Sequence, residues 1–314
     1  MARRGGCARY GIRSTVRSLI VVVLCVSLLT AAFRTALASG DTIQPEDLLH
    51  LRFLSNAVIS HDGSRVAFVM SRPDGASNAT LSNIWLVDVK SGALRQLTRG
   101  ESDVEPAWSP DDATIAFSSG RGDKKEIYAI AVGGGEAQAL THLDTGASHP
   151  LWSHDGKHLA FLSPTLDDPP PTAVDWKLLG IEPPEKLKKS DVKTIARLDF
   201  EENGEGETFN RHAHLWVMRA DGSEQHALTS GHEWSERNAA WSYDDATIAF
   251  NSLRRPDPAR IAMDLYTVAP SGGPMRRLAL GTVASTQPVW THDDRHLLYF
   301  TGMNNDPAEM SGVA

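Results

Sequence analysis

The sequence contains only two cysteines, Cys7 and Cys25, and both lie within its first 38 residues. The remaining chain therefore has no thiol that could form a disulfide, bind a metal ion or attack a substrate. Exported proteins often use disulfides, but this sequence offers none beyond its first segment.

Positive charge is also scarce after that segment. The formal net charge is −8, and residues 1–38 hold six arginines and no acidic residue, so the rest of the chain carries −14. Binding to nucleic acid depends on clustered lysine and arginine against phosphate. This composition excludes nucleic acid as an expected partner.

Sequence motifs of catalysis and metal binding are missing as well. No G-x-S-x-G occurs, and the nearest approach, Gly75 to Ala79 around Ser77, lies in a polar loop between two expected strands. His212 and His214 alternate along a strand without a third ligand nearby. We expect no catalytic residue, no metal site and no cofactor in this chain.

Only one long hydrophobic run is present, from Leu19 to Ala32, and five arginines precede it. It has the length of a signal-peptide core and is short for a membrane span. Ala36 and Ala38 form the small-x-small pattern of a cleavage site, which predicts removal of residues 1–38 and export to the periplasm or the exterior. An uncleaved anchor is the alternative.

One pattern recurs five times in the rest of the chain. An aromatic or apolar residue precedes Ser or Thr, any residue, Asp, and then Gly or Asp, and a short apolar strand follows. Its serine or threonine positions are Ser60, Ser109, Ser153, Ser242 and Thr291. Self-similarity at this spacing is typical of β-propellers, in which each repeat forms one blade.

The intervals between repeats support this interpretation. Ser60 to Ser109 is 49 residues, Ser109 to Ser153 is 44, and Ser242 to Thr291 is 49. Each repeat also ends in an aromatic strand, a turn and a strand, so four strands make one blade. The interval from Ser153 to Ser242 is 89, which predicts an insertion in the third blade at about 163–212.

The repeated residues are given structural roles. Ser60-His61-Asp62 spells a catalytic triad in letters, but neighbours on one turn point apart, and the histidine position holds Pro110 and Tyr243 in sister repeats. We expect the tryptophans to pack between blades and the aspartates to stabilise turns. The residues concerned are Trp108, Trp152, Trp241 and Trp290, with Asp62, Asp111, Asp155, Asp244 and Asp293.

The fold predicted from these patterns is all-β: an incomplete β-propeller of about four to five four-stranded blades with a short N-terminal helix. The expected organisation is a signal peptide at 1–38, a lead with the helix at 39–55 and a partial propeller at 56–314. Strand edges left open would allow self-association. No membrane span is expected after signal cleavage.

Two segments resemble a known family. The lead QPEDLL at 44–49, followed by AVISHDGSRVAF at 57–68, is similar to the start of the propeller in the prolyl oligopeptidase family, in its acylaminoacyl-peptidase and dipeptidyl-peptidase branch. IARLDFEENGEG at 195–206, before HLWV at 214–217, resembles a third-blade hairpin of that branch. The blade repeats alone fit TolB-like propellers equally well.

The resemblance implies the propeller of an exported serine peptidase, which admits peptides to an α/β-hydrolase domain that this sequence does not reach. In related dipeptidyl peptidases, acidic residues of the propeller hold the free amino group of the substrate. Glu201 and Glu202 would take that role here; a solvated acidic hairpin tip is the alternative. The competing function is a non-catalytic TolB-like propeller that binds a protein partner. A fragment, a truncated frame and a true short protein all remain open.

Overall fold

A computed structural model describes most of the chain after residue 43. The described ranges are 44–166, 201–202, 206–207, 211–231, 234–252, 263–278, 285–301 and 312–313. The predicted signal peptide lies outside them. Two compact units are distinguished, residues 1–50 and 51–314.

The first unit contributes one described element, the 3-10 helix η1 (Pro45–His50). Two hydrogen bonds close its start. The Gln44 N–H donates to Asp47 Oδ2 at 2.8 Å, and the Asp47 N–H donates to the Gln44 carbonyl at 3.0 Å. This is the short N-terminal helix expected from the sequence.

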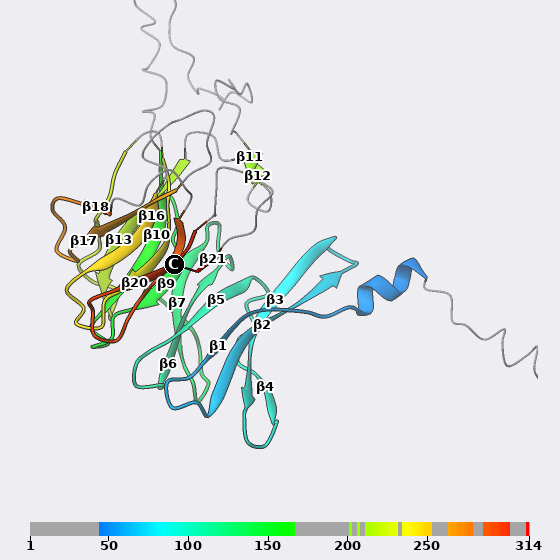
Figure 1. Ribbon diagram of the computed structural model, residues 1–314. Coiled ribbons are helices and arrows are strands. Elements are labelled where there is room, and N and C mark those ends of the chain that lie inside the picture. Colours follow the sequence, from blue (N-terminus) through cyan, green and yellow to red (C-terminus); the bar gives the residue numbers. More distant parts are fainter. Residues whose placement is uncertain are drawn as a thin grey trace, which may run out of the picture. The chain divides into compact units, whose positions relative to one another are not determined.

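The second unit consists of consecutive antiparallel sheets (Figure 1), which confirms the all-β prediction. Blade 1 comprises β1 (Phe53–Ile59), β2 (Arg65–Asp74), β3 (Ala79–Asp88) and β4 (Leu94–Gln96). Blade 2 comprises β5 (Asp103–Trp108), β6 (Thr114–Ser119), β7 (Glu126–Ala131) and β8 (Gln138–Ala139). In both, strands pair in chain order, as in a propeller blade.

Blade 3 has the same four-stranded form with a longer connection in its middle. It comprises β9 (Ser148–Trp152), β10 (His158–Leu166), β13 (Arg211–Arg219) and β14 (His226–Ala227). Between β10 and β13, the strands β11 (Glu201–Glu202) and β12 (Gly206–Glu207) form a small antiparallel hairpin of their own. The extra residues of the third repeat therefore connect its second and third strands.

The last two sheets repeat the arrangement. Blade 4 comprises β15 (Glu236–Trp241), β16 (Ile248–Ser252), β17 (Asp264–Val268) and β18 (Arg276–Leu278). In blade 5, β19 (Ser285–Trp290), β20 (Leu297–Thr301) and β21 (Gly312–Val313) form three described strands.

The first strand of each sheet contacts the first strand of the next sheet. These contacts join β1 to β5, β5 to β9, β9 to β15 and β15 to β19. The fourth strands have their main contacts inside their own sheet. The first strands are thus the inner strands of the array, and their exposed side chains line the surface toward its axis.

In blades 2, 3 and 4 the second strand is buried on both faces, which explains its nearly continuous apolar sequence. Phe117, Phe161 and Phe250 occupy one repeat position and are at most 1% exposed. Each stacks on the aromatic residue opposite it in the third strand, at ring-centroid distances of 5.9 to 6.1 Å. These ring pairs form the centre of each inter-blade layer.

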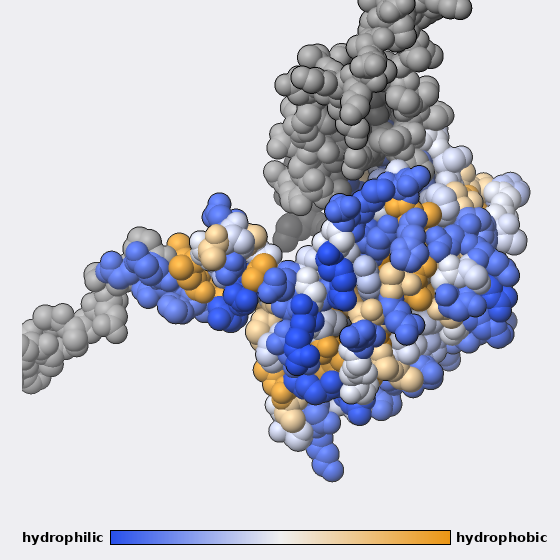
Figure 2. All heavy atoms as spheres, turned by 180° about the vertical axis from the view of Figure 1, so that it is seen from behind, coloured by the Kyte–Doolittle hydropathy of each residue, from blue (hydrophilic) through white to orange (hydrophobic). Residues whose placement is uncertain are grey.

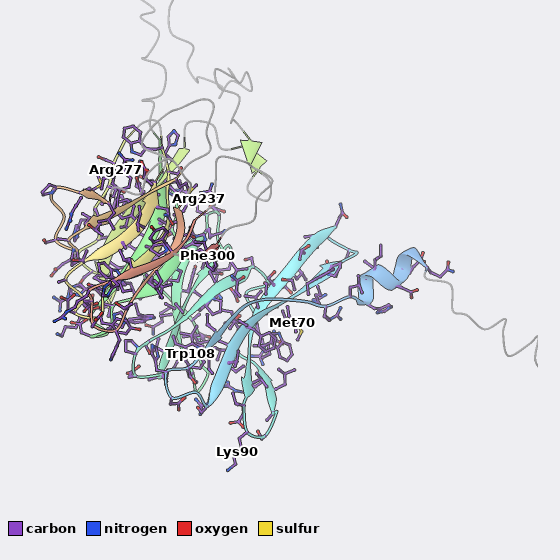
Figure 3. The ribbon with its side chains drawn as sticks, viewed as in Figure 1. Met70, Lys90, Trp108, Arg237, Arg277 and Phe300 are labelled. Carbon is purple, nitrogen blue, oxygen red and sulfur yellow. The ribbon has the colours of Figure 1, made fainter. Side chains whose placement is uncertain are left out.

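The four repeated tryptophans join neighbouring blades. Each indole N–H donates to a carbonyl in the first strand of the preceding blade, and Trp108, for example, reaches the Val58 carbonyl at 3.0 Å. The acceptors for Trp152, Trp241 and Trp290 are Ala107, Leu151 and Ala240, each at 3.2 Å. Figure 3 shows Trp108 among the side chains between blades 1 and 2. Trp108 and Trp241 are buried, whereas Trp152 and Trp290 are half-buried.

Candidate functional site

A ring of polar residues on the inner strands is the main candidate for contact with a ligand. In every blade, the residue three positions before the tryptophan position has a positive φ, between 48° and 57°. These residues, here called the axial residues, are Asn56, Glu105, His149, Asn238 and Gln287. Each lies where the pairing of the first strand with the second shifts register, so each occupies a β-bulge.

This backbone conformation is costly for residues other than glycine, and asparagine tolerates it best. Glu105, His149 and Gln287 nevertheless adopt it. Conformational strain of this kind costs on the order of 1 to 3 kcal/mol for each residue, and it persists only where the surrounding structure enforces it. The bulge turns a polar side chain toward the axis in every blade.

Glu105 and His149 link blades 2 and 3 at this surface. The His149 Nε2 atom lies 3.2 Å from Glu105 Oε1, and the backbone N–H of His149 donates to Glu105 Oε2 at 3.0 Å. Ser118 donates to the same carboxylate oxygen at 2.5 Å and accepts the His149 N–H at 3.1 Å. Glu105 is 18% exposed and His149 is 53% exposed, so the pair is accessible from the axis.

Blades 4 and 5 repeat this contact with a neutral amide. Asn251 occupies the repeat position of Ser118, and its Oδ1 accepts the backbone N–H of Gln287 at 3.1 Å. The side-chain amide of Asn238 donates to the same oxygen at 3.3 Å. The axial surface thus offers amide and carboxylate groups that could hydrogen-bond a peptide backbone.

One serine lies next to the axial histidine. Ser148 Oγ is 3.1 Å from His149 Nδ1, whose other ring nitrogen faces Glu105, so serine, histidine and carboxylate follow in the order of a catalytic triad. However, Ser148 and His149 are adjacent on one strand, and a triad also needs donors that form an oxyanion hole. The loop serine Ser77 instead donates to Asp74 at 2.6 Å.

The predicted turn residues form a closed hydrogen-bond pattern. Ser60 Oγ donates to Asp62 Oδ1 at 2.7 Å, and the same bond recurs in every repeat, ending on Asp111, Asp155, Asp244 and Asp293. Hydrogen bonds from the Ser60 side chain and from Ser64 lower the pKa of Asp62 to about 2. Neither Ser60 nor Asp62 contacts the neighbouring His61 in a triad arrangement, since the His61 ring faces Asp112 at 2.9 Å.

Burial and hydrogen bonding oppose one another at Asp155. Burial raises its pKa, but hydrogen bonds from the Lys157 N–H and from Ser153 outweigh that and bring it to about 2. These aspartates are therefore held ionised by their turns, as expected for residues that stabilise a hairpin.

The glutamates predicted to bind a substrate amino group lie on the β11–β12 hairpin. Glu201 pairs with Glu207 and Glu202 with Gly206. The positions of their side chains, like residues 167–200 before them, lie outside the described residues. Their role stays a prediction.

No described strand covers the face of blade 1 that points away from blade 2. A cavity of about 620 Å³ on it is lined by apolar side chains, including Leu54, Phe68, Met70 and Leu94. Arg52, Arg72 and Arg99 border a second cavity of about 380 Å³, together with Trp85 and Glu101. Leu54 and Leu94 are more than half exposed.

Neither a metal site nor a membrane helix is found in the part of the chain that the structure describes. No group of three or more His, Asp or Glu side chains is arranged to hold a metal ion there. Likewise, no helix among those residues is long and apolar enough to cross a membrane.

Comparison with known proteins agrees with this geometry. A family model for the TolB beta propeller domain matches residues 54–168. An uncharacterized peptidase of Bacillus subtilis, YuxL, is 31% identical over 232 residues, which cover 71% of this chain and 33% of YuxL. The chain thus spans about a third of the length of this curated relative.

Solved structures show the same fold at lower identity. The acylaminoacyl peptidase of Pyrococcus horikoshii matches with a TM-score of 0.61 and 16% identity, over 85% of this chain and 38% of that protein. The β-propeller domain of the Trilobed protease from Pyrococcus furiosus, described as having an open velcro topology, matches with a TM-score of 0.51 and 15% identity. That match covers 83% of this chain and 67% of the other. The chain is therefore a TolB-like β-propeller array that resembles the N-terminal propeller of the acylaminoacyl peptidases and the prolyl oligopeptidase family, and it covers only their propeller part.

Proposed function

We propose that this chain is the propeller of an exported serine peptidase and that it restricts access to a catalytic domain. The observation that carries the proposal is the 31% identity with a peptidase over 232 residues, which correspond to only a third of that peptidase. The match covers 71% of this chain, so most of it falls within the unit that forms the sheets. The propeller fold of the acylaminoacyl peptidase agrees with this assignment.

The axial residues support a role in handling peptides. A peptide that passes along the inner strands meets hydrogen-bonding side chains from successive blades, among them Glu105, Asn238 and Gln287. Peptide groups need hydrogen-bond partners when they leave water. The axial surface therefore suits an extended peptide, whose backbone groups can reach these side chains one after another.

Recognition of the free amino group of the substrate by Glu201 and Glu202 belongs to the same proposal. The hairpin of β11 and β12 extends from the connection between the second and third strands of blade 3. An ammonium group would be held there by ion pairing with carboxylates. Export of the protein through the leader at residues 1–38 completes the proposal.

A non-catalytic propeller that binds a protein partner is the second candidate. The match of residues 54–168 to the TolB beta propeller domain favours it specifically. Such a protein would use one rim of the array as a docking surface and would need no hydrolase domain.

The coding sequence after the codon for Ala314 discriminates the two functions. A G-x-S-x-G motif followed by Asp and His supports the peptidase, and a stop codon supports the binding protein. The gating role is then tested on the whole gene product by comparing cleavage of a short peptide with cleavage of a folded protein. Cleavage of both at similar rates would contradict gating.

The Glu201→Gln/Glu202→Gln variant tests the proposed amino-group site in the same assay. We expect it to raise KM for a peptide with a free amino terminus and to leave KM unchanged for the same peptide with an acetylated terminus. Equal effects on both peptides would remove these residues from substrate recognition.

A further inference from the structure

The backbone conformation of Glu105 is costly for a glutamate. Its φ is 57°, and the sister positions in blades 1 and 4 hold Asn56 and Asn238, at 48° and 53°. Asparagine is enriched in this left-handed region, whereas glutamate is not. Strain of this kind persists where the surrounding structure over-determines it, and it gathers at ligand sites. The side chain of Glu105 is therefore a candidate for direct contact with a ligand.

One carboxylate oxygen of Glu105 is fixed by two donors, and the other has a single contact. The Ser118 hydroxyl, which is fully buried, and the backbone N–H of His149 donate to Oε2 at 2.5 and 3.0 Å. Oε1 lies 3.2 Å from His149 Nε2, and no other hydrogen bond of this carboxylate is present among the described residues. Because a carboxylate oxygen can accept more than one hydrogen bond, Oε1 has room for a further donor.

The imidazole of His149 leaves the charge of this carboxylate uncompensated. Ser148 Oγ lies 3.1 Å from Nδ1, and Glu105 faces the other ring nitrogen. A ring with its hydrogen on Nε2 donates to Glu105 and accepts the Ser148 hydroxyl at Nδ1, so a neutral imidazole satisfies both contacts. The pair then keeps the negative charge of the carboxylate, on a side chain that is 18% exposed.

Glu105 is also the accessible acidic residue of the inner strands, as far as the structure describes them. The other acidic residues on these strands, Asp103 and Glu236, are 0% exposed, and each lies 2.7 Å from a basic side chain. The inner strand of blade 4 carries a cationic residue, Arg237. A positively charged group on the axial surface is therefore attracted to blades 2 and 3.

We propose that Glu105 and His149 form a subsite for the cationic side chain of a lysine or arginine in a bound peptide. This inference rests on the proposed role of the axial surface in handling peptides. The ammonium or guanidinium group donates to Oε1 of Glu105 and lies beside the imidazole. Glu105 is in the middle of β5, so a peptide along the axis extends past it in both directions. A side chain of the peptide, and not its terminal amino group, therefore reaches the carboxylate.

Four peptides test the subsite by binding to the whole chain. Each is an amidated hexapeptide Gly-Ser-X-Ser-Gly-Gly with a neutral fluorophore at its carboxyl end, in which X is lysine or acetyl-lysine and the amino terminus is free or acetylated. Fluorescence anisotropy measures Kd. With the terminus acetylated, we expect the lysine peptide to bind about tenfold more tightly than the acetyl-lysine peptide. Freeing the terminus of the acetyl-lysine peptide should change Kd by less than about twofold.

A spectroscopic measurement locates the site without a substitution. The lysine peptide should shift the NMR resonance of the Cε1 proton of His149, and the acetyl-lysine peptide at equal saturation should leave that resonance in place. A lysine peptide that binds without shifting it would overturn the subsite.

Glu105→Gln removes the charge and keeps the shape of the side chain. We expect it to reduce the preference for lysine to within about twofold and to leave binding of the acetyl-lysine peptide unchanged, which shows that the variant is folded. Glu101→Gln is the matched control, because Glu101 is an exposed glutamate with a φ of 63° outside the inner strands, and it should keep the tenfold preference.

The outcomes separate this inference from the role in peptide handling. Equal binding of the lysine and acetyl-lysine peptides, or a preference that persists in Glu105→Gln, would overturn the subsite alone. A gain in affinity from the free amino terminus and none from lysine would overturn the assignment to a side chain. If none of the four peptides binds, the proposed role of the axial surface is overturned together with the subsite.

Discussion

At the scale of single residues, the tryptophan of each repeat contributes both apolar burial and a directed hydrogen bond. Trp241 is 4% exposed, packs in a core cluster with Phe250 and Leu215, and donates to the Leu151 carbonyl at 3.2 Å. Removing the ring would open a cavity between blades 3 and 4 and leave the carbonyl without its donor.

We therefore predict that Trp241→Ala lowers the free energy of unfolding by about 3 to 5 kcal/mol. Because Trp152 is half-buried, Trp152→Ala should lower the free energy of unfolding by an amount on the order of 3 kcal/mol. Urea denaturation of each variant measures this. Lys90→Ala, at the tip of the turn between β3 and β4 (Figure 3), serves as a surface control. A loss below about 1 kcal/mol for Trp241→Ala would contradict the inter-blade role.

The turn aspartates make stability depend on acid. In the folded chain, hydrogen bonds from Ser60 and Ser64 hold the pKa of Asp62 at about 2. At Asp155 burial raises the pKa, but hydrogen bonds from the Lys157 N–H and from Ser153 outweigh burial and bring the pKa to about 2 as well. In the unfolded chain these carboxyls titrate near 3.9. Their contribution to stability is therefore fully present above about pH 4 and disappears as the pH falls toward 2.

Denaturant midpoints at pH 5, 4 and 3 should decrease in that order. Replacing both aspartates by asparagine should lower the midpoint at pH 5 and flatten its dependence on pH below 4. A midpoint that stays constant from pH 5 to pH 2.5 would contradict the ionised turn.

The repeated turn is also where sequence patterns were most informative. The letters Ser or Thr, any residue, Asp, and then Gly or Asp recur in all five repeats, so the blade period, the sheet order and the turn positions could be predicted from them. The axial residues could not, because Asn56, Glu105 and His149 share a backbone conformation and no chemical type. Their one sequence signal is a proline directly after Glu105, His149 and Gln287, two residues before the tryptophan.

At the scale of the strand, the bulge that carries each axial residue stores conformational strain. Gln287 has a φ of 53°, and its backbone N–H donates to Asn251 at 3.1 Å, so the position is held by its neighbour blade. Glycine adopts this φ without steric cost, whereas β-branched residues avoid it.

We predict that Gln287→Gly leaves stability within about 0.5 kcal/mol of the original chain, while Gln287→Val lowers it by at least about 1 kcal/mol. Both substitutions remove the same side-chain amide, so each serves as the control for the other. Equal stabilities would show that the left-handed conformation is not imposed at this bulge.

Hydrogen bonds between the turns of neighbouring blades could not be predicted from the sequence, although the residues that form them stand in the repeated pattern. In the sequence Asp112 is an ordinary turn residue, but in the structure it accepts the amides of His61 and Asp62, which lie 51 and 50 residues earlier in the chain. A contact between repeats follows from the angle at which sheets pack, and repeat letters do not encode that angle. The roles of Glu201 and Glu202 remain predictions because the positions of their side chains lie outside the described residues.

At the scale of the whole chain, two sheet faces have no neighbouring blade among the residues that the structure describes. Exposed apolar residues gather on both, with Leu54 and Leu94 on blade 1 and Leu298 and Phe300 on blade 5. Figure 2 shows apolar side chains exposed between hydrophilic ones on the side it draws. Contiguous apolar patches of this kind promote association.

We predict that the chain from Ser39 to Ala314 self-associates through these faces and their strand edges. The double variant Leu298→Lys/Phe300→Lys should raise the fraction of monomer, measured by sedimentation velocity, by several-fold. Ser91→Lys/Lys90→Glu, on an exposed turn, is the matched control and should leave the distribution unchanged. A monodisperse monomer for the original chain would contradict this prediction.

We predict that this propeller holds no activated serine nucleophile, and labelling with a serine-directed fluorophosphonate tests this prediction most directly. We expect no labelling of the Ser39 to Ala314 chain, because an activated serine needs both a base and an oxyanion hole. Ser148, which lies 3.1 Å from His149 Nδ1, is the first position to mutate, followed by Ser77. Stoichiometric labelling that disappears in Ser148→Ala or Ser77→Ala would contradict the claim and establish a catalytic site within the propeller.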